Sequence, residues 1–257
     1  MAWNPQQYLK FSGHRLRPAV DLLMRIPEFP VRRVADLGAG AGNVTRLLRE
    51  RWPDAVVVGV EGSAEMVAAG RKAAPDVEWL QQDLGSWRPA QTYDVVYSNA
   101  ALHWLGDHET LFPRVMEQVE PGGILAVQMP RNFGAPSHTL VAETVRNGPW
   151  RGRLEHLVTP APVREPGFYH NLLTPQSEDI DIWETEYLQV LQGENPVKEW
   201  TKGTWLTQFL DALEGQDEKA AFEAAYGERV AKAYPRNSMG QTLFPFRRLF
   251  IVAQRKA

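Results

Sequence analysis

The stretch VADLGAGAGN, residues 34–43, decides the fold. An apolar, β-branched run before closely spaced glycines predicts a strand that turns at Gly38-x-Gly40-x-Gly42 into a helix. Such a turn lets a ligand approach bare backbone at a helix N-terminus. Asp36 stands two residues before the first glycine. The turn therefore combines backbone access with a negative charge.

The chain on either side of this turn alternates between strand and helix patterns. Strands are predicted at 31–37, 55–61, 77–83, 93–100 and 124–129. Helices are predicted between them, one of them capped by Ser63. Strands that alternate with helices in units of about 30 residues indicate right-handed βαβ crossovers and a parallel sheet.

The pattern changes after Met129. Residues 130–175 predict loops with short helices, and a further strand is expected from Asp181. Residues 195–234 indicate two or three helices, and FRRLFIVAQRK, residues 246–256, predicts a last strand. Because this late strand returns to the sheet, we expect one domain with helical insertions after the fifth and sixth strands.

Composition narrows the function classes. The net charge of −3 disfavours a nucleic-acid groove, and no apolar run reaches membrane-spanning length. The absence of cysteine excludes disulfides, thiolate nucleophiles and cysteine zinc sites. The N-terminus has no apolar signal region, so we expect a soluble cytoplasmic protein, a monomer or weak homo-oligomer. The histidines show no metal-binding spacing, and we predict no metal.

The acids indicate which ligand the turn prefers. A diphosphate would lie against Asp36, and like charges in contact near a surface cost on the order of 1–4 kcal/mol. Asn43 stands where a dinucleotide fingerprint has its third glycine. Glu61 ends the second predicted strand, where a carboxylate can accept from both ribose hydroxyls, and Asp83 ends the third, within reach of an adenine amine. S-adenosylmethionine, with its adenine, ribose diol and cationic tail, fits this pattern.

Other interpretations stay open from these residues. Asp36 can instead cap a turn, and Glu61 can be a solvated acid at a strand end. A nicotinamide-dependent oxidoreductase and a non-catalytic regulator that binds the cofactor are the more distant functional alternatives.

Five motifs in order, VADLGAGAGN, VVGVEGS, QQDL, YDVVYSNAALHWL and VEPGGILAV, resemble those of class I S-adenosylmethionine-dependent methyltransferases over residues 30–130. The resemblance implies a doubly wound, mostly parallel, seven-stranded Rossmann-like sheet in an α/β fold. It implies that residues 1–30 form an N-terminal cap, 31–130 a cofactor-binding core, 131–240 acceptor-binding loops and a helical cover with one sheet strand, and 241–257 the C-terminal strand.

The same resemblance implies a cofactor site for S-adenosylmethionine, with S-adenosylhomocysteine as product. Asp36 would lie near the methionine amino group, Glu61 would hold the ribose, and Asp83 with Leu84 would contact adenine. The full implied set is Asp36, Gly38, Gly40, Glu61, Gly62, Met66, Asp83, Leu84 and Asn99.

The flanks WNPQQYLKFSGHRLRPAVDLL, NAALHWLGDHETLFPRV, GGILAVQMPRN and LFPFRRLFIVAQR are similar to those of the trans-aconitate 2-methyltransferases. The similarity is looser over 145–165 and 195–240. It implies esterification of one carboxylate of a small tricarboxylic acid. Another small-molecule acceptor on the same core is the nearest alternative, and a carbon acceptor would need a base, for which His103 is the candidate.

A carboxylate is already ionised at neutral pH, so its methylation needs positioning and exclusion of water rather than a base. The other carboxylates of the acceptor need arginine or hydrogen-bonding partners. The candidates are Arg15, Arg17, His103, Arg131, Arg164 and Tyr169. We also expect Pro18 in the first turn of a helix, and Trp3 with Tyr8 beside the methionine moiety.

Overall fold

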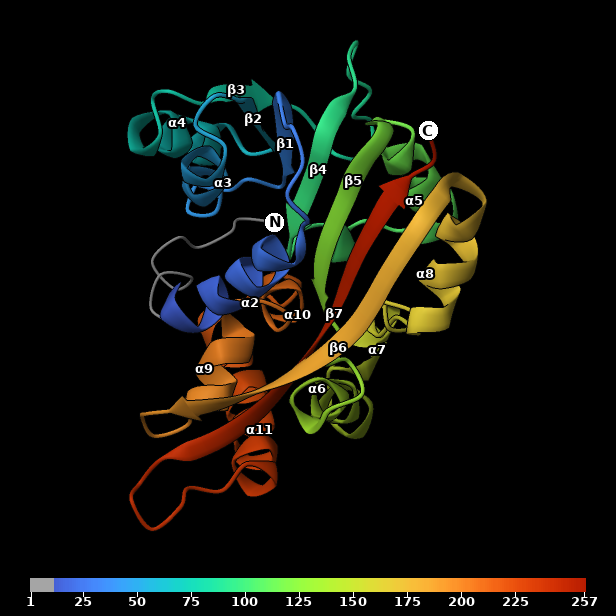
Figure 1. Ribbon diagram of the computed structural model, residues 1–257. Coiled ribbons are helices and arrows are strands. Elements are labelled where there is room, and N and C mark those ends of the chain that lie inside the picture. Colours follow the sequence, from blue (N-terminus) through green and yellow to red (C-terminus); the bar gives the residue numbers. More distant parts are fainter. Residues whose placement is uncertain (1–11) are drawn as a thin grey trace. The chain divides into compact units, whose positions relative to one another are not determined.

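The computed structural model describes residues 12–257, with side chains from Leu16 onward (Figure 1). Its contacts divide the chain into two compact units. Residues 15–130, 162–185 and 248–257 form one, here called the sheet unit. Residues 131–161 and 186–247 belong to the other, the helical unit. The predicted domain boundaries stay a prediction.

One sheet of seven strands runs in the order β3-β2-β1-β4-β5-β7-β6. The strands are β1 (Arg33–Leu37), β2 (Val56–Glu61), β3 (Glu78–Gln81), β4 (Tyr93–Asn99), β5 (Val119–Pro130), β6 (Ser177–Leu191) and β7 (Thr242–Arg255). β1 pairs in parallel with β2 and β4, β4 pairs in parallel with β5, and β7 runs antiparallel to β5. This confirms the predicted doubly wound, mostly parallel sheet.

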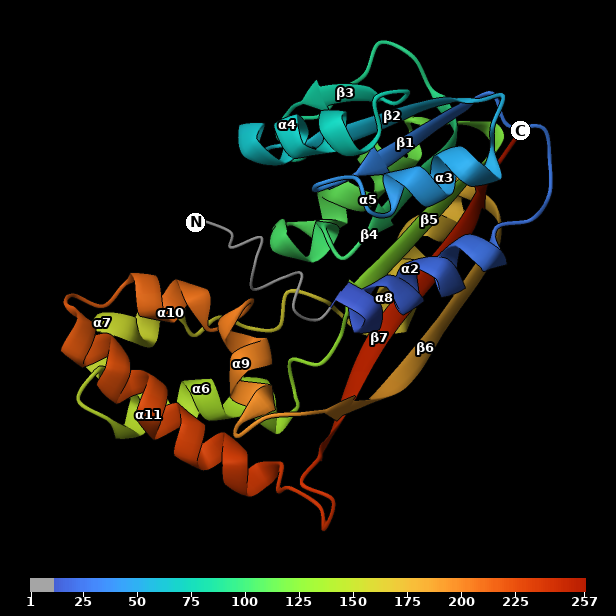
Figure 2. The same cartoon turned by 90° about the vertical axis from the view of Figure 1, so that its left-hand side faces the viewer.

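Helices cover both faces of the sheet unit (Figures 1 and 2). They are α2 (Ser12–Arg25), α3 (Thr45–Arg51), α4 (Ala64–Ala73), α5 (His108–Met116) and α8 (Pro166–Leu173), with short 3₁₀ turns η1 (Leu102–Trp104) and η3 (Thr174–Gln176). Tyr97 of β4 donates its hydroxyl hydrogen to the Ala19 carbonyl of α2 at 2.7 Å. Ser63 caps α4 as predicted, accepting from the Met66 N–H at 3.3 Å.

The prediction for Pro18 was wrong. It lies inside α2, which begins at Ser12, rather than in the first helical turn. An interior proline removes one N–H donor from the helix. The helix continues through it because Ala19, Leu22 and Leu23 form an apolar face that is almost fully buried.

Trp79 of β3 packs under the glycine turn. A Cβ at Gly42 would lie 3.0 Å from its ring, one at Gly59 2.9 Å, and one at Gly70 2.3 Å. The indole N–H donates to the Ala74 carbonyl at 3.1 Å, which fixes the ring at the end of α4. The third glycine of the turn, out of register for a dinucleotide, is therefore needed for packing, because Gly42 makes room for an aromatic ring.

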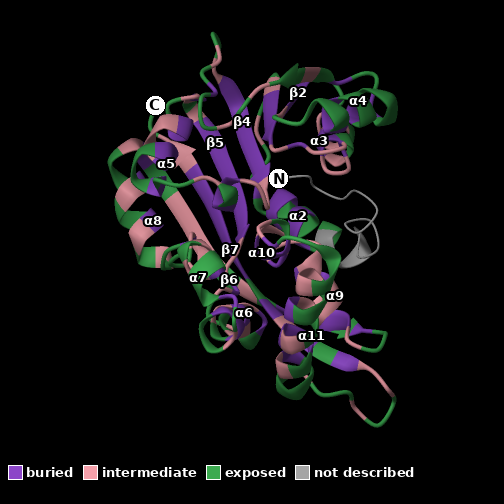
Figure 3. Ribbon diagram, turned by 180° about the vertical axis from the view of Figure 1, so that it is seen from behind, coloured by how far each residue is buried: buried purple, intermediate pink, exposed green. Residues whose placement is uncertain are grey.

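The helical unit has a core of its own. Its helices are α6 (Pro136–Asn147), α7 (Arg151–Leu154), η2 (Glu155–Leu157), α9 (Pro196–Lys202), α10 (Thr207–Asp211) and α11 (Gln216–Ala233). Trp200, Phe209, Phe222 and Phe244 are among its buried side chains. Figure 3 shows buried residues, in purple, on helices of this unit as well as on the strands β4 and β5.

Three helices between 195 and 234 agree with the prediction, whereas α6 is longer than the short helices predicted for 130–175. The buried face of α6 consists of Ser137, Val141, Thr144 and Val145. Two of these four residues are polar, so their helical spacing gives only a weak hydrophobic period.

Replacing Gly70 by Ala tests the packing around Trp79. Helix propensity alone would favour alanine by about 1 kcal/mol. Because the new Cβ would overlap the indole ring, we expect the free energy of unfolding to fall by about 1–3 kcal/mol. The measurement is chemical denaturation. The control is Gly152→Ala in α7, where no atom lies within 4 Å of the Cβ position and no destabilisation is expected. A Gly70→Ala protein as stable as the control would contradict the account.

Candidate functional site

The strand order reverses between β1 and β4, because the chain leaves β1 toward β2 and β3 and returns to β4. Open α/β sheets bind ligands at the carboxyl ends of their strands at such a switch point. Several residues predicted for the cofactor lie at these ends, in the sheet unit.

Asp36 of β1 is buried, with 2% of its surface exposed. Its Oδ2 accepts a hydrogen bond of 2.7 Å from the Thr45 hydroxyl at the start of α3. Burial raises the pKa of the Asp36 carboxyl to about 7, against the Thr45 hydrogen bond, and the charge of Glu61 raises it further. A buried cation next to this carboxylate would reverse that effect. The site therefore favours a positively charged group.

The glycines of the turn have different tasks. Gly38 has φ +75°, and a Cβ there would lie 2.2 Å from the Ala101 Cβ, so this residue lets the loop after β4 pack closely. Gly40 has φ +55°, and no atom lies within 4 Å of its Cβ position. The backbone at Gly40 is thus open to an approaching group.

Glu61, at the end of β2, bridges the turn and the next helix. Its Oε2 accepts from the Gly40 N–H at 3.0 Å, and its Oε1 accepts from the Ser63 N–H at 2.9 Å. Each carboxylate oxygen can accept a second hydrogen bond. The carboxylate is thus held in place with capacity for two further donors. Gly62 beside it is exposed, and Met66 of α4 is buried.

Asp83 does not end a strand, contrary to the prediction. β3 ends at Gln81, and Asp83 lies in the following loop, exposed, where its Oδ1 accepts from the Ser86 N–H at 3.1 Å. The side chain of Leu84 reaches the turn, 3.6 Å from the Cβ position of Gly38. The β3 loop therefore contacts the glycine turn through Leu84.

The end of β4 carries an orphaned acceptor and a strained residue. The Oδ1 of Asn99 is buried and has no hydrogen-bond donor among the residues that the structure describes. Ala100 follows with φ +54°, a conformation that costs a residue with a Cβ about 1–3 kcal/mol. Strain and an unsatisfied buried acceptor together are typical of a ligand site.

The residues predicted to bind the acceptor differ in how far they are buried. The side chain of Arg17 is 72% exposed and lies 3.9 Å from Asp21. His103 in η1 is buried and packs its ring against the exposed Trp104, with centroids 4.6 Å apart. The side chain of Arg15, and the residues Trp3 and Tyr8, lie outside the part of the chain that is described.

Tyr169 of α8 is fully buried, and its hydroxyl is hydrogen-bonded within the protein. Its hydroxyl lies 2.7 Å from Nδ1 of His108 and accepts from the Arg164 N–H at 3.1 Å. Nε2 of His108 lies 3.1 Å from the Leu102 carbonyl, and burial lowers the pKa of this histidine. Through these contacts the Tyr169 hydroxyl joins α8 to α5. Its contact with an acceptor stays a prediction.

Arg164 and Arg131 lie in different units. The Arg164 guanidinium is exposed and stacks on the Phe168 ring, 4.7 Å from its centroid. Arg131, partly buried, follows β5 in the helical unit, and its N–H donates to the Arg247 carbonyl at 2.9 Å.

Three polar residues of this region, Thr45, Gln128 and Arg248, were not predicted from the sequence. Gln128 of β5 is fully buried, and Arg248 of β7 is 5% exposed. The signal for Arg248 was the strand alternation, which sets it on the buried face shared by Phe250 and Val252.

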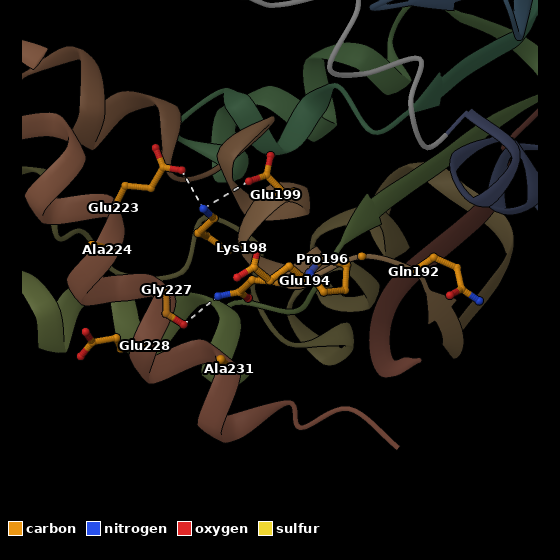
Figure 4. A pocket seen from close by; sticks show the side chains of 12 residues that line it. Gln192, Glu194, Pro196, Lys198, Glu199, Glu223, Ala224, Gly227, Glu228 and Ala231 are labelled. Atoms are coloured by element: carbon orange, nitrogen blue, oxygen red, sulfur yellow. Dashed lines mark hydrogen bonds and ion pairs between the residues drawn. The ribbon is translucent and has the colours of Figure 1, made fainter. Parts of the chain in front are cut away.

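The helical unit contains a separate cleft of about 510 Å³ between α9 and α11 (Figure 4). In it Lys198 Nζ lies 2.9 Å from Glu223 Oε1 and 3.3 Å from Glu199 Oε1, and Lys202 Nζ lies 2.8 Å from Glu223 Oε2. Lys198 is thus paired with two acids, and the other charged residues that line the cleft, Glu194 and Glu228, are also acidic. This cleft is not suited to an anionic ligand.

Two negative findings apply to residues 12–257. Among the described side chains, which begin at Leu16, no group of three histidine, aspartate or glutamate residues could hold a metal ion. No helix there is long and apolar enough to cross a membrane.

Comparisons with known proteins agree with this geometry. A family profile described as a methyltransferase domain matches residues 34–123. The trans-aconitate 2-methyltransferase of Azoarcus sp. is 48% identical over 98% of this chain and 99% of that protein. The one of Klebsiella pneumoniae is 44% identical over 98% of each. Phosphoethanolamine N-methyltransferase 2 of Haemonchus contortus, solved with S-adenosyl-L-methionine, shares the fold, with a TM-score of 0.57 at 16% identity over 94% of this chain and 53% of that one.

The doubly wound sheet and the matched domain at its glycine turn define a methyltransferase. The identity to curated relatives extends over nearly the whole chain, including the helical unit. The chain belongs to the trans-aconitate 2-methyltransferase family.

Replacing Asp36 by Asn tests the cost of burying this acid. The unfolded chain releases the Asp36 proton near pH 4, whereas the folded chain holds it until about pH 7. This group therefore favours folding at low pH, and its contribution is lost as the pH rises from about 4 to about 7. We expect the ligand-free Asn variant to lose less stability than the wild type between pH 5 and pH 8, measured by urea denaturation. The exposed Asp54→Asn is the control. Equal pH slopes in wild type and Asp36→Asn would refute the buried, protonated state.

Proposed function

We propose that this protein transfers the methyl group of S-adenosylmethionine to a carboxylate of trans-aconitate, giving a monomethyl ester and S-adenosylhomocysteine. The observation that best supports S-adenosylmethionine as the methyl donor is the buried Asp36 carboxyl, with its pKa raised to about 7, beside the open backbone of Gly40. The full-length identity to trans-aconitate 2-methyltransferases supports the acceptor.

The donor fits the polar groups of the sheet unit. In this proposal Asp36 attracts the methionine ammonium, and the turn at Gly38 and Gly40 lies along the methionine and ribose. Glu61 has the capacity to accept from both ribose hydroxyls while keeping its bonds to two backbone N–H groups. The orphaned Oδ1 of Asn99 would accept from the donor at the end of β4.

The adenine would lie over the loop after β3. Exposed Asp83 can accept from the exocyclic amine through the lone pairs that Ser86 leaves unused. Leu84 joins this loop to the glycine turn and would offer its N–H to a ring nitrogen. Gly62 and Met66 complete the proposed ribose and adenine side.

When bound, S-adenosylmethionine supplies a methyl group on a positively charged sulfur. The protein's task is to hold an ionised carboxylate in line with that methyl group at about 3–3.5 Å and to exclude water. No side chain has to remove a proton, because the carboxylate is already ionised at neutral pH. His103 is proposed as a hydrogen-bonding group rather than a base.

The acceptor's remaining carboxylates need cationic partners. The candidates are Arg15, Arg17, Arg131 and Arg164, and Tyr169 is a further candidate whose hydroxyl also bonds within the fold. We further propose that the protein works in the cytoplasm, as a monomer or weak homo-oligomer, on this small acid and without nucleic acid or membrane partners.

Replacing Glu61 by Ala should weaken S-adenosylhomocysteine binding by about 1–3 kcal/mol, because hydrogen bonds to a charged group are lost. Isothermal titration calorimetry measures the change. The control is Glu65→Ala in the first turn of α4, which should bind normally. Unchanged affinity in Glu61→Ala would remove this carboxylate from the ribose.

The rate at saturating donor and acceptor should be nearly flat from about pH 6 to pH 8, since the nucleophile needs no base. The ester product is identified by mass. If the rate instead changes with pH near the pKa of a histidine, and this change disappears in His103→Gln, His103 acts as a base. The acceptor chemistry would then be different.

A further inference from the structure

Four polar side chains lie on one face of the sheet unit, across the carboxyl ends of neighbouring parallel strands. Asp36 of β1 is in register with Tyr97 of β4, and Asn99 comes two residues later on the same face. Asn99 is in turn in register with Gln128 of β5. The row thus runs from the proposed methionine position across β4 to β5.

Arg248 extends this row onto β7. Gln128 is in register with Phe250, and Arg248 is in register with Pro130, two residues beyond Gln128. Directly opposite residues of an antiparallel pair share a face, so Arg248 lies on the face of Gln128 at the carboxyl end of β5. Figure 1 shows β4, β5 and β7 side by side in this order.

Gln128 and Arg248, the two residues of this row that were not predicted from the sequence, are both buried. Gln128 is fully buried, and Arg248 is 5% exposed. An Arg248 guanidinium nitrogen donates to the Gln128 Oε1 at a long 3.4 Å. The Gln128 Nε2 has no acceptor among the described residues. A buried amide donor without an acceptor costs about 1–3 kcal/mol, and a ligand oxygen would remove that cost.

We propose that Arg248 and Gln128 bind one carboxylate of the acceptor that is not methylated, an inference that rests on the proposed function. Arg248 donates from its planar guanidinium, and Gln128 donates from Nε2 while its Oε1 keeps the arginine oriented. Asp36 binds the cationic end of the donor at one end of the row, and Arg248 binds the anionic acceptor at the other. The two substrates are thus sorted by charge.

This pair suits the task better than the exposed arginines. The side chain of Arg17 is 72% exposed and has Asp21 nearby, and Arg164 is exposed on the Phe168 ring. Charge-assisted hydrogen bonds in a buried place are less screened by water and salt than those at the surface. A buried guanidinium therefore discriminates between acceptors that have and lack the carboxylate.

The test replaces Arg248 by Gln and measures steady-state methylation of trans-aconitate and S-adenosylhomocysteine binding. We expect the KM for trans-aconitate to rise about ten- to a hundredfold, with donor binding unchanged. The preference for trans-aconitate over a dicarboxylate should also fall. The matched control is Arg247→Gln, one residue away on β7, half exposed and 3.7 Å from Glu186, which should keep both values. A KM within twofold of wild type in Arg248→Gln would overturn the inference.

Gln128→Glu supplies a second variant with nearly the same shape. If the pair only supports the fold, a carboxylate beside Arg248 forms an internal ion pair and leaves KM unchanged, which would overturn the inference. If the pair binds the acceptor, the new charge repels it and KM rises at least as much as in Arg248→Gln. Thermal denaturation shows that each variant is folded.

The wild type separates this inference from the proposed function. A wild-type protein that binds S-adenosylhomocysteine but methylates no tricarboxylate overturns both. A wild-type protein that methylates trans-aconitate, with Arg248→Gln equally active at low acceptor concentration, overturns only the role of Arg248 and Gln128.

Discussion

The buried carboxylate of Asp36 is the constraint on which the site depends. Burial raises its pKa to about 7, with one hydroxyl from Thr45 as partner. A folded protein gains nothing from an acid in that state, since an apolar or amide side chain would be accommodated more easily. Its position, at the end of β1 and before an open glycine turn, makes sense for a site that binds a cation.

The surrounding loops are held around this turn by contacts rather than by chain continuity. The loop after β4 packs on Gly38 through Ala101, and the loop after β3 contacts it through Leu84. Glu61 binds the Gly40 N–H from the end of β2. Three strand ends thus converge on one turn, and the strain at Ala100 is placed where they meet.

Much of the fold could be predicted from the sequence because its signals are local. Apolar runs such as residues 55–61 and the Ser63 cap depend on neighbours in the chain. The failures depend on distant packing. Pro18 lies inside α2, which is stabilised by its buried apolar face. The buried face of α6 includes polar residues, so its sequence lacks a clear hydrophobic period.

The residues of the candidate site also fall into two groups, those predicted from local sequence and those that depend on distant contacts. Asp36 and Glu61 were predicted from motif position, and they lie near the ends of β1 and β2, beside the turn. Their contacts with a ligand stay a prediction. Tyr169 was predicted for an acceptor, and its contact with His108, between residues 61 positions apart, was not predicted. Gln128 and Arg248, 120 positions apart, meet only through the antiparallel pairing of β5 and β7. No local sequence pattern predicts the register in which β5 and β7 pair.

The most direct measurement is the proton released when S-adenosylmethionine binds, obtained by calorimetry in buffers of different ionisation heats. At about pH 6 the α-ammonium is fully protonated and Asp36 is mostly protonated in the free protein. The account predicts release of close to one proton per donor bound there, little release at about pH 8, and none in Asp36→Asn. Binding without proton release at pH 6, equally tight at both pH values, would contradict it.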